Sequence, residues 1–246
     1  GARARARGGA CSAGGVWGVT PPRNRGWARP APEPIPGGGV RLSAPGMETL
    51  TVAVPRAAGT VPMDIFGDKV ETVPAEDDAA HRWCSTYLGT QARLVHLDSP
   101  ATRRPVDPEH ALPGETVSLA DGYPLLLTTT ASLDALNSLI ARGEHAAEGP
   151  LPMNRFRPNV VVAGTAAWAE DDWTRVAIGE VTFRVATMCG RCAVTTTDQR
   201  TGDRGKEPLR TLGGHRRMGG KLVFGQNLVP LGPGTIRAGD PVDVPG

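Results

Sequence analysis

The sequence predicts a β-rich, mixed α+β protein in which short strands build a barrel or sandwich and a few helices lie at its periphery. Short segments of alternating apolar and polar residues recur at close spacing along the chain. The 246 residues include 32 Gly and 23 Pro, which supply frequent turns between such strands. Two segments, 75–89 and 131–143, instead predict helices.

The composition excludes several classes of protein. With 39% hydrophobic residues, the chain is long enough for one large or two small domains with a core. No apolar run approaches the roughly 20 residues that span a bilayer, so we expect no membrane segment. Four cysteines are too few for a disulfide scaffold at this length. A reducing, cytoplasmic setting is therefore the default expectation.

The charge distribution argues against a nucleic-acid partner. Residues 1–46 contain seven arginines and one acid, Glu33, for a net charge of +6. Since the whole chain carries +2, the remainder carries −4. Nucleic-acid-binding domains usually place their basic residues on the folded body. Here the body is mildly acidic, and the basic excess belongs to the first residues.

Residues 1–39 are low-complexity sequence dominated by Gly, Pro, Arg and Ala. No apolar periodicity is visible there, and such a composition buries too little surface to offset its ordering entropy. We expect this stretch to be disordered or mis-assembled, as from out-of-frame coding sequence ahead of the first methionine, Met47. A transit peptide or a basic arm is the alternative interpretation.

The elements up to residue 114 follow from local patterns. Residues 40–55 alternate in polarity around a Pro-Gly turn and predict two short strands. Residues 64–75 predict another strand pair. The segment 75–89 has acids in its first turn and a glycine at its end, which is typical of a helix. Residues 91–98 predict a strand, and the Pro-rich residues 100–114 predict a loop.

The remaining elements alternate one helix with many strands. Residues 124–130 predict a buried strand, and residues 131–143 predict a helix with Ser132 as its N-cap and Gly143 at its end. Further strands are expected over 157–164, 176–187 with a turn at Gly179, 192–198, 221–231 and 240–244.

Cys189-Gly190-Arg191-Cys192 is the one cysteine pair with a suggestive spacing. Structural zinc needs four ligands, and no second pair accompanies this one. A thioredoxin-like pair needs a helix after its first cysteine, whereas the β-branched residues that follow Cys192 disfavour a helix. The alternative is that the two cysteines are simply small residues at a strand end, with no functional role. Arg191 favours a functional thiol, because a neighbouring cation stabilises the thiolate that binds a soft metal.

The segment 155–159 (Arg-Phe-Arg-Pro-Asn) places two arginines and an amide at the start of a strand. Such groups can bind a phosphate or another anion, although solvated surface arginines are the simpler interpretation. The chain has no P-loop and no dinucleotide-binding glycine motif, which disfavours ordinary nucleotide sites. The histidines have no recognisable nucleophile beside them, so we expect no hydrolase triad.

Several blocks together resemble the MOSC domain, the family found at the C-terminus of molybdenum cofactor sulfurases and in the mitochondrial amidoxime-reducing component and its bacterial relatives. The blocks are RFRPNVVVAG (155–164), the Trp168–Trp173 pattern, and residues 178–198, 207–217, 224–229 and 234–244. Upstream, residues 40–52 and 119–137 resemble the later part of the β-barrel-like domain that precedes MOSC in those proteins. The resemblance covers about residues 40–246. It implies a MOSC β-barrel with peripheral helices over 113–246 and a partial MOSC N-terminal β-barrel-like domain over 40–112.

The resemblance implies a site for the molybdenum cofactor (molybdopterin) around the cysteine pair. In the reductase branch of the family the second cysteine ligates molybdenum, so Cys192 is the expected metal ligand and catalytic residue. Gly190 and Arg191 fall on positions that contact the pterin dithiolene. Cys189 is not expected to be a ligand.

Further cofactor contacts are implied upstream of the cysteine pair. Arg157 and Asn159 fall on positions that hold the phosphate and the pterin. Asp121, Gly122 and Tyr123 align with another turn that faces the cofactor. Family members also carry cofactor-binding segments ahead of residue 40, which residues 1–39 do not match.

The function implied is that of an oxidoreductase that reduces small N-hydroxylated substrates. Because the sequence shows no ferredoxin-like cysteine cluster, electrons are expected from a separate reductase, ferredoxin or cytochrome-type protein. One alternative is a non-catalytic carrier of the cofactor or of sulfur. Another is a truncated paralogue that serves only as a scaffold.

Overall fold

The computed structural model describes residues 2–6, 16–20, 31–56, 59–65, 68–99, 106, 109–110, 112–117, 119 and 122–244, with the side chains of residues 2–6, 16–18, 20, 31–32 and 68 left aside. The chain divides into two compact units. The barrel unit comprises Gly1–Gly9 and Tyr123–Gly246, and the two-sheet unit comprises Ala10–Gly122. The division therefore falls between residues 122 and 123, whereas the sequence suggested a boundary between 112 and 113.

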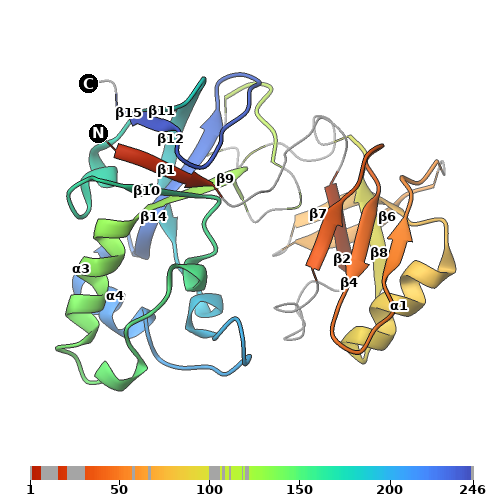
Figure 1. Ribbon diagram of the computed structural model, residues 1–246, viewed down its shortest axis with the longest axis horizontal. Coiled ribbons are helices and arrows are strands. Elements are labelled where there is room, and N and C mark those ends of the chain that lie inside the picture. Colours follow the sequence, from red (N-terminus) through yellow and green to blue (C-terminus); the bar gives the residue numbers. More distant parts are fainter. Residues whose placement is uncertain are drawn as a thin grey trace. The chain divides into compact units, whose positions relative to one another are not determined.

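The strands of the barrel unit are β1 (Ala2–Ala6), β9 (Leu125–Thr129), β10 (Val160–Ala163), β11 (Arg175–Ile178), β12 (Val181–Gly190), β13 (Arg217–Met218), β14 (Lys221–Pro230) and β15 (Pro241–Asp243). They follow the order β12-β11-β15-β1-β10-β9-β14-β13 (Figure 1). An additional pairing of β14 with β12 closes this sheet into a barrel. Within the described residues, β9 and β10 run parallel and the other neighbouring strands of this sheet run antiparallel.

The barrel core follows from the period of two along its strands. In β10 and β11, buried residues alternate with more exposed ones, as expected when one face of each strand points inward. The inward side chains form one apolar cluster of Leu127, Val160, Val162, Val176, Ile178, Val181, Phe183 and Leu228. β12 and β14 are the longest of these strands, and irregular pairing near Met188 bends the end of β12. That end carries the cysteine pair.

Two helices, α3 (Thr130–Ile140) and α4 (Leu209–His215), lie together along one side of the barrel (Figure 1). Their apolar residues pack with parts of the loops and of β14 in a second cluster of Leu136, Ile140, Leu151, Phe156, Leu212 and Phe224. These features confirm the predicted β-rich, mixed α+β fold with a barrel and peripheral helices.

The start of α3 differs from the sequence prediction. Thr129 is the N-cap, and its hydroxyl oxygen accepts a hydrogen bond from the Ser132 N–H at 3.1 Å. Ser132 instead lies buried in the first turn, so its assignment as the cap was wrong. The helix ends at Ile140, whose carbonyl accepts a hydrogen bond from the Gly143 N–H at 2.9 Å.

The two-sheet unit contains β2 (Val16–Thr20), β3 (Ala31–Pro34), β4 (Val40–Ser43), β5 (Leu50–Val52), β6 (Val61–Ile65), β7 (Asp68–Pro74), α1 (Asp78–Leu88) and β8 (Arg93–Leu97). One sheet has the order β2-β8-β7-β6, and the other has the order β3-β4-β5. The helix predicted over 75–89 is present as α1. Asp77 caps its N-terminus, and Gly89, at a φ of 63°, ends it in the left-handed conformation.

Three strands of the two units, β1, β2 and β3, lie within residues 1–39, where the local sequence predicts none. β1 pairs with β10 and β15, β2 pairs with β8, and β3 pairs with β4. Backbone hydrogen bonds to strands elsewhere in the chain do not depend on a local apolar pattern. This explains why composition alone did not reveal these strands. Residues 7–15 and 21–30 lie outside the described residues.

The barrel requires glycine at one position of β14. Gly225 has a φ of 81°, and a Cβ atom there would lie 2.5 Å from the Leu127 carbonyl oxygen on β9. We expect Gly225→Ala to lower the free energy of unfolding by about 2–4 kcal/mol, because it adds both backbone strain and a steric clash. Chemical denaturation measures this loss. Gly213→Ala in α4 is the matched control, because the added Cβ atom meets no atom within 4 Å. Equal losses of unfolding free energy in the two variants would contradict the close packing of β9 and β14.

Candidate functional site

The cysteine pair lies where β12 ends. Gly190 is the last residue of β12, and Cys192 is the N-cap of the 3-10 helix η5 (Ala193–Thr196). The strand predicted over 192–198 was therefore wrong. The Thr195 hydroxyl donates to the Cys192 carbonyl at 2.9 Å, and the Thr196 hydroxyl donates to the Ala193 carbonyl at 2.8 Å. Such bonds between threonine side chains and the local backbone favour a turn over an extended strand.

The two cysteines have different environments. Cys192 is exposed and forms no disulfide. Cys189 is half-buried, and its Sγ accepts a hydrogen bond from Arg191 Nη1 at 2.8 Å. The cation of the motif thus contacts the sulfur of Cys189 and not that of Cys192, which corrects the simple interpretation of Arg191 as a neighbour of the exposed thiol. In the two-sheet unit, burial raises the pKa of Cys84 to about 11, which keeps that thiol protonated.

Arg191 is held by several groups of the barrel unit. Its Nη2 donates to the Phe156 carbonyl at 2.8 Å, and its guanidinium lies 5.6 Å from the centre of the Phe156 ring. Its backbone N–H donates to the Leu222 carbonyl at 2.7 Å. The Nε atom is buried and has no hydrogen-bond partner within the described part of the chain.

Arg157 follows the 3-10 helix η3 (Met153–Phe156) and has a φ of 54°, in the left-handed region. It is exposed, and its guanidinium makes no hydrogen bond or ion pair with any side chain or backbone group that the structure describes. Asn159 is exposed too, but part of its side chain is engaged. Its Oδ1 accepts from the Leu126 N–H, and its own N–H donates to the Leu126 carbonyl, both at 2.9 Å. The Asn159 side-chain amide nitrogen is the group that remains for a ligand.

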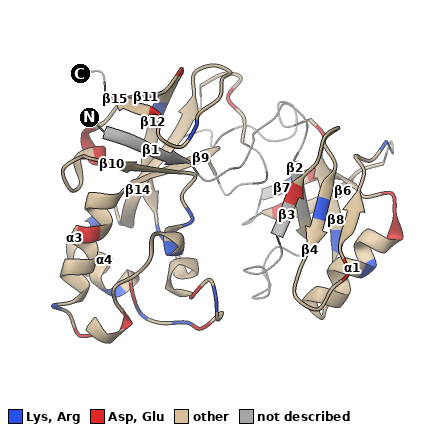
Figure 2. Cartoon of the chain, viewed as in Figure 1, with Lys and Arg blue, Asp and Glu red and all other residues tan. Residues whose placement is uncertain are grey.

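Arg155 joins η3 to η5. Its side chain is 11% exposed, its Nη1 donates to the Thr195 carbonyl at 3.4 Å, and its Nη2 lies 3.6 Å from Asp198 Oδ2. Hydrogen bonds from the Arg200 and Thr201 N–H groups, together with the charge of Arg155, hold the pKa of Asp198 below its usual value. Both acidic and basic residues lie along the loop between η5 and α4; Figure 2 shows the two kinds of charge mixed over the barrel unit.

The structure thus brings Gly190, Arg191 and Cys192 near Arg157 through the contacts between η3, η5 and the end of β12. Gly190 packs against Lys221, since a Cβ at this position would lie 3.3 Å from the Lys221 Cδ. Of the predicted cofactor-facing turn, Gly122 and Tyr123 are half-buried residues ahead of β9, and Asp121 lies outside the described residues.

A buried ion pair beside the site was not foreseen. Arg216 Nη2 lies 2.6 Å from Asp171 Oδ2, and the two side chains are 9% and 13% exposed. Gln226 Nε2 donates to Asp171 Oδ1 at 3.0 Å, and the Arg216 guanidinium lies 4.2 Å from the centre of the Trp168 ring. These partners are far apart in the sequence. The acidic run before Trp173 signalled the carboxylates but not their partners.

A buried carboxyl lies next to this pair in the sequence. Glu170 is fully buried, and its Oε2 accepts hydrogen bonds from Ser132 Oγ at 2.9 Å and from Thr129 Oγ1 at 3.2 Å. Ser132 Oγ also accepts from the Trp168 N–H at 2.8 Å. Glu170 therefore ties the start of α3 to η4 (Ala169–Asp172). Desolvation by burial raises the pKa of Glu170 despite these hydrogen bonds.

Glu170 should make the stability of the barrel unit depend on pH. Because its pKa is higher in the folded than in the unfolded chain, the folded chain binds the proton more tightly. Its contribution to stability is therefore full below the unfolded pKa and is lost as the pH rises through the folded pKa. As the pH rises through the pKa of Glu170 in the folded chain, the denaturation midpoint of the wild type should fall. We expect this fall to be smaller in Glu170→Gln. Asp172→Asn, an exposed neighbour, is the control, and an unchanged slope in Glu170→Gln would contradict the assignment.

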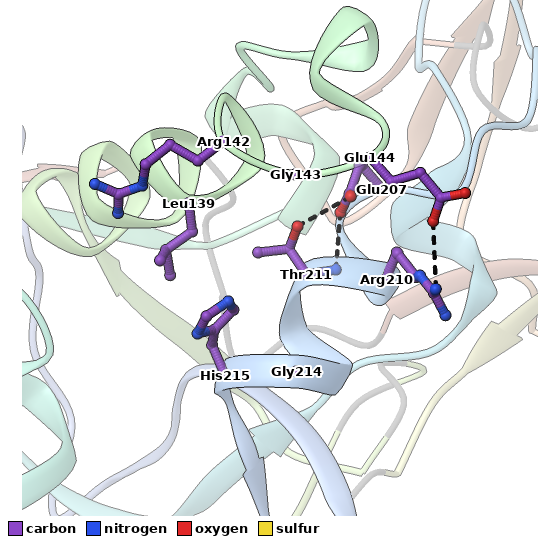
Figure 3. Close-up of a pocket in the computed structure, with 9 residues that line it drawn as sticks. All are labelled: Leu139, Arg142, Gly143, Glu144, Glu207, Arg210, Thr211, Gly214 and His215. Carbon is purple, nitrogen blue, oxygen red and sulfur yellow. Dashed lines mark hydrogen bonds and ion pairs between the residues drawn. The ribbon is translucent and has the colours of Figure 1, made fainter.

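A separate hollow lies between the end of α3 and α4 (Figure 3). It has a volume of about 510 Å³ and is lined by Leu139, Arg142, Gly143, Glu144, Glu207, Arg210, Thr211, Gly214 and His215. The buried Glu207 carboxylate accepts from the Thr211 N–H at 3.1 Å and hydroxyl at 2.9 Å, and Arg210 lies 3.3 Å from Glu144. None of the predicted site residues lines this hollow.

The described residues contain no group of three or more His, Cys, Asp and Glu side chains that could hold a metal ion. Cys192 is the one exposed thiol among the cysteines described. A metal bound there would need further ligands from a chelating group that it brings with it. Membrane-spanning helices are absent from the described part of the chain, since no helix has the necessary length and apolar character.

Fold and site together define a closed β-barrel domain in which an exposed thiol, Cys192, starts the short turn that Arg155 contacts. The family model described as the MOSC domain matches residues 114–243, more than half of the chain. The chain therefore belongs to the MOSC domain family.

Curated relatives support this assignment. The chain is 38% identical over 191 residues to mitochondrial amidoxime-reducing component 1 of Mus musculus, covering 72% of this chain and 54% of that protein. It is 32% identical over 176 residues to molybdenum cofactor sulfurase of Oryza sativa subsp. japonica, covering 66% and 21%. It spans about half the length of the amidoxime-reducing relative. The crystal structure of YiiM from Geobacillus stearothermophilus matches with a TM-score of 0.36 and 16% identity, covering 50% of this chain and 55% of that chain.

Proposed function

We propose that the barrel unit binds the molybdenum cofactor and that the protein reduces N-hydroxylated substrates with electrons from a separate reductase. The observation that carries this proposal is the exposed Cys192 thiol of a MOSC domain. It lies at the start of η5, which Arg155 contacts, and directly after Arg191, which binds the carbonyl that precedes Arg157. The similarity to an amidoxime-reducing component supports N-hydroxylated compounds as the substrate class. The similarity to a molybdenum cofactor sulfurase supports the same cofactor.

The groups present fit this cofactor. Its pterin dithiolene would supply the chelating sulfurs that the described residues lack, and a single cysteine thiolate is a suitable soft ligand for the metal. Its phosphate requires cationic donors, and the Arg157 guanidinium is exposed and unpaired within the described structure. The buried Nε atoms of Arg155 and Arg191 have no partner among the described groups and are further donors.

Each residue has a distinct task in this proposal. Cys192 binds the metal as a thiolate, and Arg157 neutralises the phosphate. The Asn159 amide nitrogen would donate to the pterin, and Gly190 and Arg191 would contribute further contacts from the end of β12. Gly122 and Tyr123, with Asp121, would form a further contact. When bound, the cofactor supplies a two-electron redox centre that can remove an oxygen atom from nitrogen.

The described side chains form no metal-binding cluster of their own. We propose a reductase, ferredoxin or cytochrome-type donor. A reducing compartment such as the cytoplasm would keep the Cys192 thiol available.

An activity assay separates this function from its alternatives. The full chain is purified from a host that makes the molybdenum cofactor and is supplied with an aromatic amidoxime and a chemically reduced viologen. We expect conversion to the amidine. A loaded protein that never turns over the amidoxime but transfers its cofactor to an apo-molybdoenzyme would instead be a carrier, as the similarity to a cofactor sulfurase allows. Protein that acquires no molybdenum would be a scaffold.

A further inference from the structure

One guanidinium connects the two turns that carry Cys192 and Arg157. Arg191 directly precedes Cys192, and its Nη2 donates to the carbonyl of Phe156, which directly precedes Arg157. The other terminal nitrogen, Nη1, donates to the sulfur of Cys189. Both terminal nitrogens of the Arg191 guanidinium are thus hydrogen-bonded to groups of the barrel unit.

We propose that Cys189 and Arg191 form a clamp on the Phe156 carbonyl, and that this clamp sets the position of Arg157 relative to Cys192. The inference rests on the proposed function for the roles of Cys192 and Arg157 as ligands. It assigns Cys189 and the terminal nitrogens of Arg191 as positioning groups.

The Phe156 end of the clamp is rigid. Phe156 is fully buried, and its ring stacks on Phe224 with the ring centres 4.0 Å apart. The carbonyl that Arg191 binds belongs to the peptide group that leads into Arg157, whose φ of 54° is uncommon for a residue with a side chain. A hydrogen bond that fixes this peptide plane supports the left-handed conformation at Arg157. The direction of the Arg157 side chain depends on that conformation.

The Cys189 end of the clamp fixes the direction of the guanidinium. Cys189 lies on β12, and the Arg191 N–H is bound to the Leu222 carbonyl on β14, so both ends of the short Cys189–Arg191 segment are attached to paired strands. A lysine could not reproduce two donors in a fixed plane. Arg155 adds a second connection between the same segments, because it reaches from η3 to the Thr195 carbonyl of η5.

Variants of Cys189 test the clamp in cofactor-free protein. Cys189→Val keeps the size of the side chain but removes the acceptor, whereas Cys189→Ser keeps an acceptor. Thr187→Val, on the same strand, is the matched control, because its hydroxyl makes no hydrogen bond with the described residues. Amide hydrogen exchange is followed in peptides covering 153–160 and 189–196, with α1 as an internal reference.

We expect exchange in both peptides to be about tenfold faster in Cys189→Val, to be largely restored in Cys189→Ser, and to be unchanged in Thr187→Val. Arg191→Lys should resemble Cys189→Val. In loaded protein, Cys189→Val should release molybdenum faster than Cys189→Ser. Wild-type exchange rates in both Cys189→Val and Arg191→Lys would overturn the clamp. If the wild-type protein binds no molybdenum, the proposed function is wrong. The hydrogen-exchange rates of the cofactor-free variants still test the clamp independently.

Discussion

Cys192→Ser is expected to reduce amidoxime reduction to below detection while leaving the fold unchanged. A serine hydroxyl does not ionise near neutral pH and is a hard oxygen donor, so it is a poor substitute for the thiolate that a soft metal requires. The side chain is exposed, and η5 is held by the Cys192 carbonyl and not by its sulfur. Turnover with reduced viologen and the thermal unfolding midpoint measure the two effects separately.

Cys189→Ser is the control for this substitution. Serine at this position still offers Arg191 a hydrogen-bond acceptor, so we expect a partial loss of activity. Equal activity in Cys192→Ser and the wild type would contradict the assignment of Cys192 as the metal ligand. Loss of activity in both variants with a lowered unfolding midpoint would show that the motif has a structural role instead.

Asp171→Ala is expected to cause the largest loss of stability. It leaves the Arg216 guanidinium without its carboxylate at a position where the side chain is 9% exposed, and it also removes the acceptor for Gln226. Removing one partner of a buried ion pair costs about 3–5 kcal/mol in the free energy of unfolding. Denaturation with urea measures the effect.

The neighbouring Asp172 provides the matched control for the ion pair. It is exposed, so Asp172→Ala should change the unfolding free energy by less than about 0.5 kcal/mol. If Asp171→Ala is as mild as Asp172→Ala, the contacts of Asp171 with Arg216 and Gln226 do not hold η4 against the end of α4 and β14.

The parts of the fold that could be predicted are those encoded locally. The apolar run Val160–Val162 predicts the strand β10, and Asp77 and Gly89 mark the ends of α1. A barrel was predicted, but the pairing of β12 with β14 that closes it could not be, because this pairing depends on contacts between distant segments. β1 likewise becomes a strand only by pairing with β10 and β15.

The candidate site was predictable in part for the same reason. The Cys-Gly-Arg-Cys motif and the Arg-Pro-Asn segment stand out in the sequence, but their contacts do not. β-branched residues after Cys192 predicted a strand, whereas hydroxyl groups of Thr195 and Thr196 stabilise a 3-10 turn. The spacing of the two motifs along the chain does not show that Arg191 binds the carbonyl of Phe156, which lies 35 residues earlier.

In the proposed function, Cys192 anchors a pterin-chelated molybdenum ion on the barrel unit. The most direct test is elemental and pterin analysis of the purified full chain and of Cys192→Ser, both produced in a host that makes the cofactor. We expect nearly stoichiometric molybdenum and pterin in the wild type and little molybdenum in the variant. Well-folded wild-type protein without molybdenum, or equal molybdenum content in the two proteins, would contradict the claim.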